Sequence, residues 1–135
     1  MRGQVIGKSM PHGYAGSYAR QADMVVEGEI AFGAPVVLGT AGAVKPWEAA
    51  STAAKFAGVA LREVKSATDY MNQNEGGYHK NEAVPVMKRG CVNVICQNGT
   101  PAPGGRVYIR TVENESYPKA VIGGFEAAAD TGKNV

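Results

Sequence analysis

The sequence predicts an all-β protein, a small β-barrel or sandwich of short antiparallel strands with an extended N-terminal arm. Three observations support this prediction. Apolar residues alternate with polar ones in several short runs, as in half-buried strands. The 18 glycines and 7 prolines place turns between these runs. Helical periodicity is scarce, and 135 residues suit one domain, which we expect at residues 23–135 after an arm at residues 1–22.

The first strand is expected between Met24 and Phe32. The even positions of this run are apolar or glycine, whereas Glu27 and Glu29 occupy odd ones. The even positions are therefore predicted to face inward. Two shorter strands should follow, each bounded by glycine-containing turns: residues 36–38 and residues 43–45.

The next region combines a loop with the most apolar strand. Residues 48–55 are rich in alanine, but Ser51 and Thr52 interrupt them and no apolar face is wide enough to anchor a helix. We predict a loop with at most marginal helix. Residues 56–61 are apolar on both faces, so they should form a strand covered on each side, by this chain or by another subunit.

Within residues 84–96 five even positions are apolar, so Val94 is predicted to face inward. They are Val84, Val86, Val92, Val94 and Cys96. Gly90 in the middle indicates a bulge or bend, which gives one long bent strand or two short ones. Cys91 and Cys96 would point to opposite faces about 16 Å apart, beyond the reach of a disulfide. We expect buried or half-buried free thiols.

The last strands are expected at residues 106–110, after a Pro- and Gly-rich turn, and at residues 120–125. Alternation in the first of these predicts that Val107 and Ile109 face inward. Three side chains would then face outward: Arg106, Tyr108 and Arg110.

The arm, residues 1–22, contains many glycines and no alternation, so it cannot form a core of its own. Such an arm either stays disordered or becomes ordered against a partner. The second alternative is favoured because tyrosine and arginine are enriched in interface hot spots, and the arm contains Tyr14, Tyr18 and Arg20.

Composition excludes several classes of function. Fourteen basic against twelve acidic residues leave a net charge of +2, which argues against a specific nucleic-acid partner. No apolar run approaches the roughly 20 residues that cross a bilayer, so no membrane association is expected. The first residues also lack the apolar region of a signal peptide, so the protein is predicted to remain in the cell that makes it.

The inventory of reactive residues is thin. His12 lies in the arm and His79 in a glycine-containing turn, and neither has a partner nearby in the sequence, so both are expected to be solvated. Glu27 and Glu29 share an exposed strand face. No nucleophile, phosphate-loop or metal-ligand motif occurs, so we predict no enzyme, no catalytic residues, no cofactor and no metal.

Aromatic and basic residues outside the core are the candidates for binding. Loop aromatics either form a binding surface or cover the end of a barrel. The outward face of residues 106–110 could hold an acidic partner, stack on bases or simply be solvated. The candidate interface residues are Tyr14, Tyr18, Arg20, Trp47, Tyr70, Tyr78, Arg106, Tyr108 and Arg110.

Four strings follow one another along the chain: residues 28–40 with 44–46, residues 56–63, residues 77–78 with 83–90, and residues 102–108. In this order they resemble the capsid cement proteins of tailed bacteriophages. The resemblance spans residues 19–130. The sequence departs from the family pattern in a long insert at residues 65–76 and at Asn134–Val135, where the family continues into another strand.

The resemblance implies a structural virion protein without catalytic activity. It would be a cement or decoration protein on the outer capsid surface of an HK97-type shell, stabilising contacts between major capsid subunits. Its partners would be the phage major capsid protein and copies of itself, as a trimer rather than a dimer. It would be made in the bacterial host cytoplasm. The residues alone leave an alternative, a small β-barrel module that binds carbohydrate or single-stranded nucleic acid.

Overall fold

A computed structural model describes residues 23–63, 71 and 75–135, and regular structure in these residues is almost entirely β-strand. The prediction of an all-β fold is confirmed, while the arm lies outside the described residues. Each strand is two to five residues long. The elements, including two single turns of 3₁₀-helix, follow in this order: β1 (Met24–Val25), β2 (Ile30–Ala31), β3 (Pro35–Leu38), η1 (Thr40–Gly42), β4 (Val44–Pro46), η2 (Ala53–Lys55), β5 (Phe56–Ala60), β6 (Gly77–Tyr78), β7 (Ala83–Val84), β8 (Val86–Met87), β9 (Cys96–Asn98), β10 (Tyr108–Ile109) and β11 (Phe125–Glu126).

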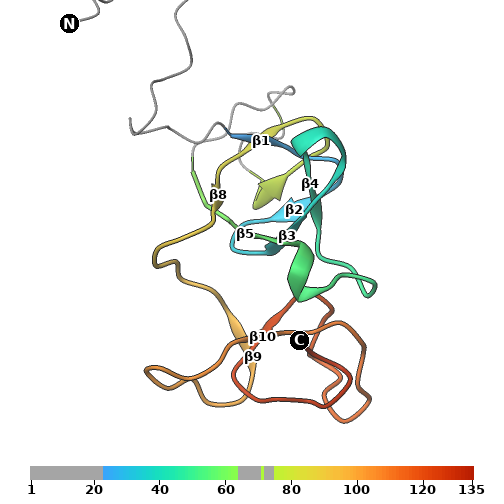
Figure 1. Ribbon diagram of the computed structural model, residues 1–135, viewed down its shortest axis with the longest axis vertical. Helices are drawn as coiled ribbons and strands as arrows, with labels where there is room; N and C mark the ends of the chain where they lie inside the picture. The colour runs from blue at the N-terminus through green and yellow to red at the C-terminus, as the bar shows by residue number, and fades with distance from the viewer. Residues whose placement is uncertain (1–22, 64–70, 72–74) are drawn as a thin grey trace, which may run out of the picture.

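The strands form small separate sheets. A four-stranded antiparallel sheet in the order β4-β3-β5-β8 is accompanied by the pairs β1-β7 and β2-β6. A further sheet, in the order β10-β11-β9, lies at the other end of the molecule (Figure 1). Its β11-β9 pair is parallel, an exception to the predicted antiparallel pairing. Among the described residues the sheets do not close into a barrel.

Two clusters of buried side chains lie on opposite faces of the four-stranded sheet. The first contains Val26, Ile30, Val36, Val44, Ala57, Ala60, Tyr78, Val84 and Val86. The second contains Val37, Trp47, Val59, Ile109 and Phe125. Neighbouring residues of β3 thus enter different clusters, as alternation along a strand requires. The prediction that residues 56–61 are covered on both faces is confirmed for Ala57–Ala60, and the cover comes from this chain.

A β-bulge in β5 explains why Ala57 and Val59 face different clusters although they are two residues apart. Val36 pairs with Gly58 and Val37 with Phe56, so Ala57 is the extra residue. Gly58 has φ +147°, and a Cβ placed there would lie 2.4 Å from the carbonyl oxygen of Met87. Only glycine allows the neighbouring strand β8 to approach this closely.

The inward phase predicted between Met24 and Phe32 is confirmed, because Val26 and Ile30 are buried and Glu29 is exposed. The run is nevertheless two strands, β1 and β2, separated by a bend. The prediction for residues 48–55 also holds, since they form a loop that ends in the single turn η2.

The prediction for residues 84–96 is correct only at its start. Val84 and Val86 are buried, but Gly90 has φ +131° and the chain leaves the sheet after β8. Val94 is 36% exposed, so its predicted inward position is wrong. The reason is that alternation reports burial only where a strand is paired, and residues 88–95 belong to no strand.

The cysteine prediction is correct in one respect and wrong in another. Cys91 and Cys96 are free thiols, as expected, but both are exposed. They lie at the two ends of the segment that passes between the sheets, where little of the chain covers them. Burial of a cysteine therefore does not follow from its apolar neighbours here.

Residues 106–110 contain a strand of only two residues, β10. Ile109 is buried as predicted, but Val107 is 64% exposed and Arg110 is fully buried, so the predicted directions of these two side chains are wrong. Likewise only Phe125 of the expected strand at residues 120–125 is in a strand. Beside β10, Val135 exchanges backbone N–H···O bonds of 2.8 and 3.0 Å with Ile109.

Candidate interaction surface

Arg110 follows β10 directly and is fully buried. Two carboxylates form ion pairs with it. Its Nε and Nη2 donate hydrogen bonds to the two oxygens of Glu126, at 2.6 and 3.0 Å. Its Nη1 donates to Asp130 at 3.1 Å. Glu126 lies on β11 beside β10, so the antiparallel pairing brings both side chains into the interior. The bidentate arrangement is the strongest geometry available to an arginine–carboxylate pair.

Amide side chains complete this cluster. Asn134 donates to Glu126 at 2.7 Å, Gln97 donates to Glu126 at 3.2 Å, and Asn114 donates to Asp130 at 2.8 Å. The hydrogen bond from Asn114, followed by the contact with Arg110, lowers the pKa of Asp130. Hydrogen bonding to Glu126 raises the pKa of Arg110. The charged groups therefore satisfy one another, and the cluster connects segments distant in sequence rather than presenting a reactive group to solvent.

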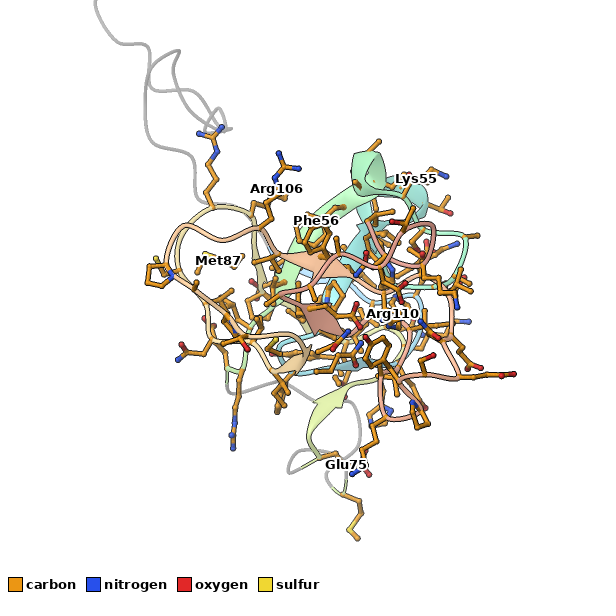
Figure 2. All side chains as sticks on the ribbon, turned by 90° about the horizontal axis from the view of Figure 1, so that it is seen from below. Lys55, Phe56, Glu75, Met87, Arg106 and Arg110 are labelled. Carbon is orange, nitrogen blue, oxygen red and sulfur yellow. The ribbon has the colours of Figure 1, made fainter. Side chains whose placement is uncertain are left out.

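The structure separates the other candidate residues predicted from the sequence. Arg106 is exposed and Tyr108 is half-buried, and Figure 2 shows Arg106 at the periphery and Arg110 in the interior. The face that would bind carbohydrate or single-stranded nucleic acid needed both arginines on the outside, so this face is not formed. Four candidates lie outside the described residues: Tyr14, Tyr18, Arg20 and Tyr70.

The loop aromatics Trp47 and Tyr78 are buried, so both cover the core instead of forming an open surface. Tyr78 donates its hydroxyl to the carbonyl oxygen of Leu61 at 2.7 Å and packs edge-on against Phe32, with ring centroids 5.1 Å apart. Burial raises the pKa of Tyr78. Trp47 belongs to the second cluster, and its Nε1 has no hydrogen-bond partner.

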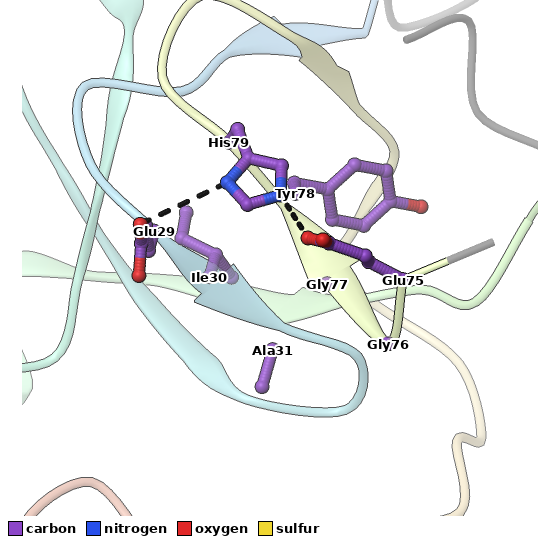
Figure 3. Close-up of a pocket in the computed structure, with 8 residues that line it drawn as sticks. All are labelled: Glu29, Ile30, Ala31, Glu75, Gly76, Gly77, Tyr78 and His79. Carbon is purple, nitrogen blue, oxygen red and sulfur yellow. Dashed lines mark hydrogen bonds and ion pairs between the residues drawn. The ribbon is translucent and has the colours of Figure 1, made fainter. Parts of the chain in front are cut away.

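His79 has two acidic neighbours, contrary to the prediction of a solvated histidine without a partner. Its Nε2 lies 2.5 Å from Glu75, and its Nδ1 lies 3.8 Å from Glu29 (Figure 3). The pairing of β2 with β6 brings Glu29 to His79, whereas Glu75 lies four residues before His79 in the same segment. They line a hollow of about 400 Å³ that contains no serine, threonine or cysteine. Among the described residues no His, Cys, Asp and Glu group is arranged to hold a metal.

A second hollow, which we call the apolar groove, lies beside exposed aliphatic side chains. Its volume is about 250 Å³. Ile95 is 86% exposed and Val121 63% exposed. Alternation does not reveal this surface, because it predicts that Val94 faces inward and gives no sign that residues 88–95 leave the sheet. The groove is lined by Phe32, Gly33, Ala34, Asn93, Val94, Ile95, Gln97, Val121, Gly123, Gly124 and Phe125.

These features define a class of protein. The charged cluster is satisfied internally, the histidine hollow has no nucleophile, and large aliphatic side chains remain on the surface. Within the described ranges, no helix has the length and apolarity needed to cross a bilayer. Exposed aliphatic side chains of this kind are typical of surfaces that contact other macromolecules.

The comparison with protein families shows which family the chain belongs to. The family model described as "Structural cement protein (E217 gp24/Pam3 gp6)" matches residues 2–135. The chain belongs to this family of phage structural cement proteins, which makes it a structural protein of the virion, associated with the phage capsid. Neither the curated proteins nor the solved structures give a match.

Proposed function

We propose that this protein binds the outside of an HK97-type phage shell and stabilises contacts between neighbouring major capsid subunits. Membership of the cement family over residues 2–135 carries the proposal. The exposed aliphatic residues and the internally satisfied charges support it, because a cement protein needs a rigid body with adhesive edges rather than a reactive pocket. The protein would be made in the host cytoplasm and would have no enzymatic activity.

Self-association is part of the proposal. A shell offers symmetric sites, so a homo-oligomer can engage several subunits at once, and each added contact raises the avidity without a new kind of interaction. A trimer matches a local threefold position and is favoured over a dimer. Sedimentation equilibrium of the free protein, followed by electron microscopy of decorated particles, would determine both the oligomer and its position.

The proposed contacts with the capsid are the arm, residues 1–22, and the start of β10 with Arg106 before it. Tyr14, Tyr18 and Arg20 have the side chains that dominate interfaces, and Tyr70, Arg106 and Tyr108 would add to them. Because the arm lacks core-forming alternation, a variant without residues 1–22 should keep its melting temperature. Loss of three hot spots at about 2 kcal/mol each should lower shell occupancy by orders of magnitude.

The experiment is cosedimentation with empty shells of the major capsid protein that lack this protein. The complete chain should bind, and the shells should then resist heating better than bare shells. The variant without residues 1–22 should bind much less at equal concentration, with thermal melts as the control for folding. Failure of the complete chain to bind would contradict the proposed function, whereas equal binding of both would contradict only the role of the arm.

A further inference from the structure

Residues 90–95, which we call the bridging segment, connect the outer edges of two sheets. β8 is the last strand of the four-stranded sheet, and β9 is the last strand of the β10-β11-β9 sheet. Between them the chain passes along one side of the molecule (Figure 1). Residues 90–95 form no backbone hydrogen bond with any other described residue. Their N–H and C=O groups are therefore available to another strand.

Among the described residues, nothing gives the bridging segment the usual protection of an open strand edge. Proteins block such edges with proline, with charged side chains or with a covering element. The bridging segment contains neither a proline nor a charged residue, and Ile95 is among the most exposed aliphatic residues described. Its position is nevertheless fixed, because Val92 packs against the second cluster. A segment that is held in place and has no strand partner among the described residues is preorganised to receive one.

The apolar groove provides a place for a side chain of that strand. Asn93, Val94 and Ile95 form one wall. The turn between β2 and β3, strand β9 and the segment that ends in β11 complete it. At about 250 Å³ the groove is smaller than the roughly 300–1,000 Å³ of small-molecule sites. It suits an aliphatic or aromatic side chain better than a free ligand.

We propose that the bridging segment receives an extended strand of the major capsid protein by β-augmentation, with an apolar side chain of that strand in the apolar groove. The incoming strand pairs along residues 90–95 and continues on the free edge of β9, which extends the β10-β11-β9 sheet. This inference rests on the proposed function.

Charge argues against the same segment of a second copy as the occupant, and the proposed function makes the capsid protein the partner. Lys88 and Arg89 are exposed immediately before the bridging segment, and no ion pair joins either of them to a described carboxylate. A matching strand would therefore carry an acidic residue at this end. Residues 88–98 contain no carboxylate, so the same segment of a second copy, paired in either direction, would leave both cations unmatched.

The two cysteines provide a direct test. Cys91 lies near the start of the bridging segment and Cys96 follows directly after it, as the first residue of β9. Both are exposed, and the chain has only these 2 cysteines. The rate of their alkylation by N-ethylmaleimide is measured by peptide mass mapping, for the free protein and for the protein bound to empty shells. We expect at least tenfold slower labelling of both thiols on shells.

The outcomes separate this inference from the proposed function. Binding to shells with unchanged labelling rates would overturn the inference and leave the function intact, whereas absence of binding would overturn the function. Slower labelling at high protein concentration without shells, together with dimer formation, would replace the capsid strand by a second copy and overturn the assignment of the occupant.

A pair of variants tests the backbone pairing itself. Val94→Pro removes one N–H donor, whereas Val94→Thr keeps that donor and the branched shape of the side chain. We expect Val94→Pro to lower shell affinity at least tenfold and Val94→Thr to change it less than twofold. Both variants should melt like the parent protein, because Val94 donates no hydrogen bond within the described chain. Equal shell affinity of the two variants would contradict β-augmentation at this position.

Discussion

Arg110 depends on Glu126 because a fully buried guanidinium has no water to replace a lost partner. Both side chains have no exposed surface. Removal of one partner from a buried ion pair leaves the other charge uncompensated, and this typically costs about 3–5 kcal/mol. One substitution in the cluster around Arg110 should therefore lower the stability of the whole β10-β11-β9 sheet.

Arg110→Met should lower the free energy of unfolding by about 3–5 kcal/mol in urea titrations. Arg106→Met provides the matched control, because Arg106 is exposed and the same substitution there should change stability by less than about 0.5 kcal/mol. Equal stability of the two variants would mean that the Arg110 pair does not support the fold.

Asp130 should make stability depend on acid pH. Its pKa in the folded protein is lowered, first by Asn114 and then by Arg110, whereas in the unfolded chain it should be about 3.9. The unfolded state therefore binds the proton more readily, so this contribution to stability is present above the unfolded pKa and is lost as pH falls through the folded pKa. Melting temperatures measured from pH 6 downward should decline below about pH 4.

The Asp130→Asn variant identifies the group responsible. An asparagine at this position cannot titrate, so its melting temperature should fall less steeply with acidification than that of the parent protein. Glu27, whose pKa is also lowered by its hydrogen bond from Thr40 and its contact with Lys45, would retain part of the dependence. Identical slopes for variant and parent would exclude Asp130 as a contributor.

Among the elements, the two halves of the apolar run at residues 84–96 should respond differently to the same change. Val84 in β7 has 0% exposure, whereas Val94 in the bridging segment is 36% exposed. Val84→Asp should destabilise the protein by roughly 3 kcal/mol or more, since it buries an unpaired carboxylate. Val94→Asp should change stability by less than about 0.5 kcal/mol, and urea titration of both variants would measure the contrast. Equal losses would show that the bridging segment is packed.

The elements also show what the sequence could and could not predict. Alternation correctly predicted the burial of Val26 and Ile30, and the continuous apolar run predicted that of Ala57–Ala60, because these residues are paired with neighbouring strands. Alternation failed at Val94 and Val107, which belong to no strand, since an apolar pattern contains no information about strand partners. The bulge at Ala57 could not be predicted from the sequence either, because it depends on how β3 and β8 approach Gly58.

The candidate site was less predictable than the fold. Alternation within residues 106–110 predicted that Arg110 faces solvent. Its partner Glu126 is 16 residues away, and local alternation cannot identify a charge partner across a sheet. His79 meets Glu29 for the same reason, through the pairing of β2 with β6. Only the cement family resemblance, which combines four strings along residues 19–130, indicated that the chain is a structural protein of the virion.

At the scale of the whole molecule, the two buried clusters share the strands β3 and β5, so neither can lose its structure independently. Val36 and Val37 are neighbours in sequence but belong to different clusters. We therefore expect residues 23–135 to unfold as one domain. Trp47 is the single tryptophan of the chain and lies in the second cluster, so its fluorescence measures the unfolding of that cluster.

Unfolding followed by Trp47 fluorescence and by far-ultraviolet circular dichroism should give the same midpoint. Val36→Ala, a change in the first cluster, should lower both midpoints together, with a loss of about 2 kcal/mol. Leu38→Ala is the control, because Leu38 is 51% exposed on the same strand. Two separate midpoints, or a fluorescence midpoint insensitive to Val36→Ala, would contradict a single cooperative domain.

The pairing of Val135 with Ile109 has a practical consequence for attaching cargo to this protein. Val135 lies beside β10, and β10 is separated from β9 by β11. A peptide fused after Val135 would thus emerge on the edge of the sheet opposite to β9, about 14 Å away across three strand spacings. Antigens or enzymes displayed from this position should leave the β9 edge free for assembly, so particles could be decorated densely by genetic fusion.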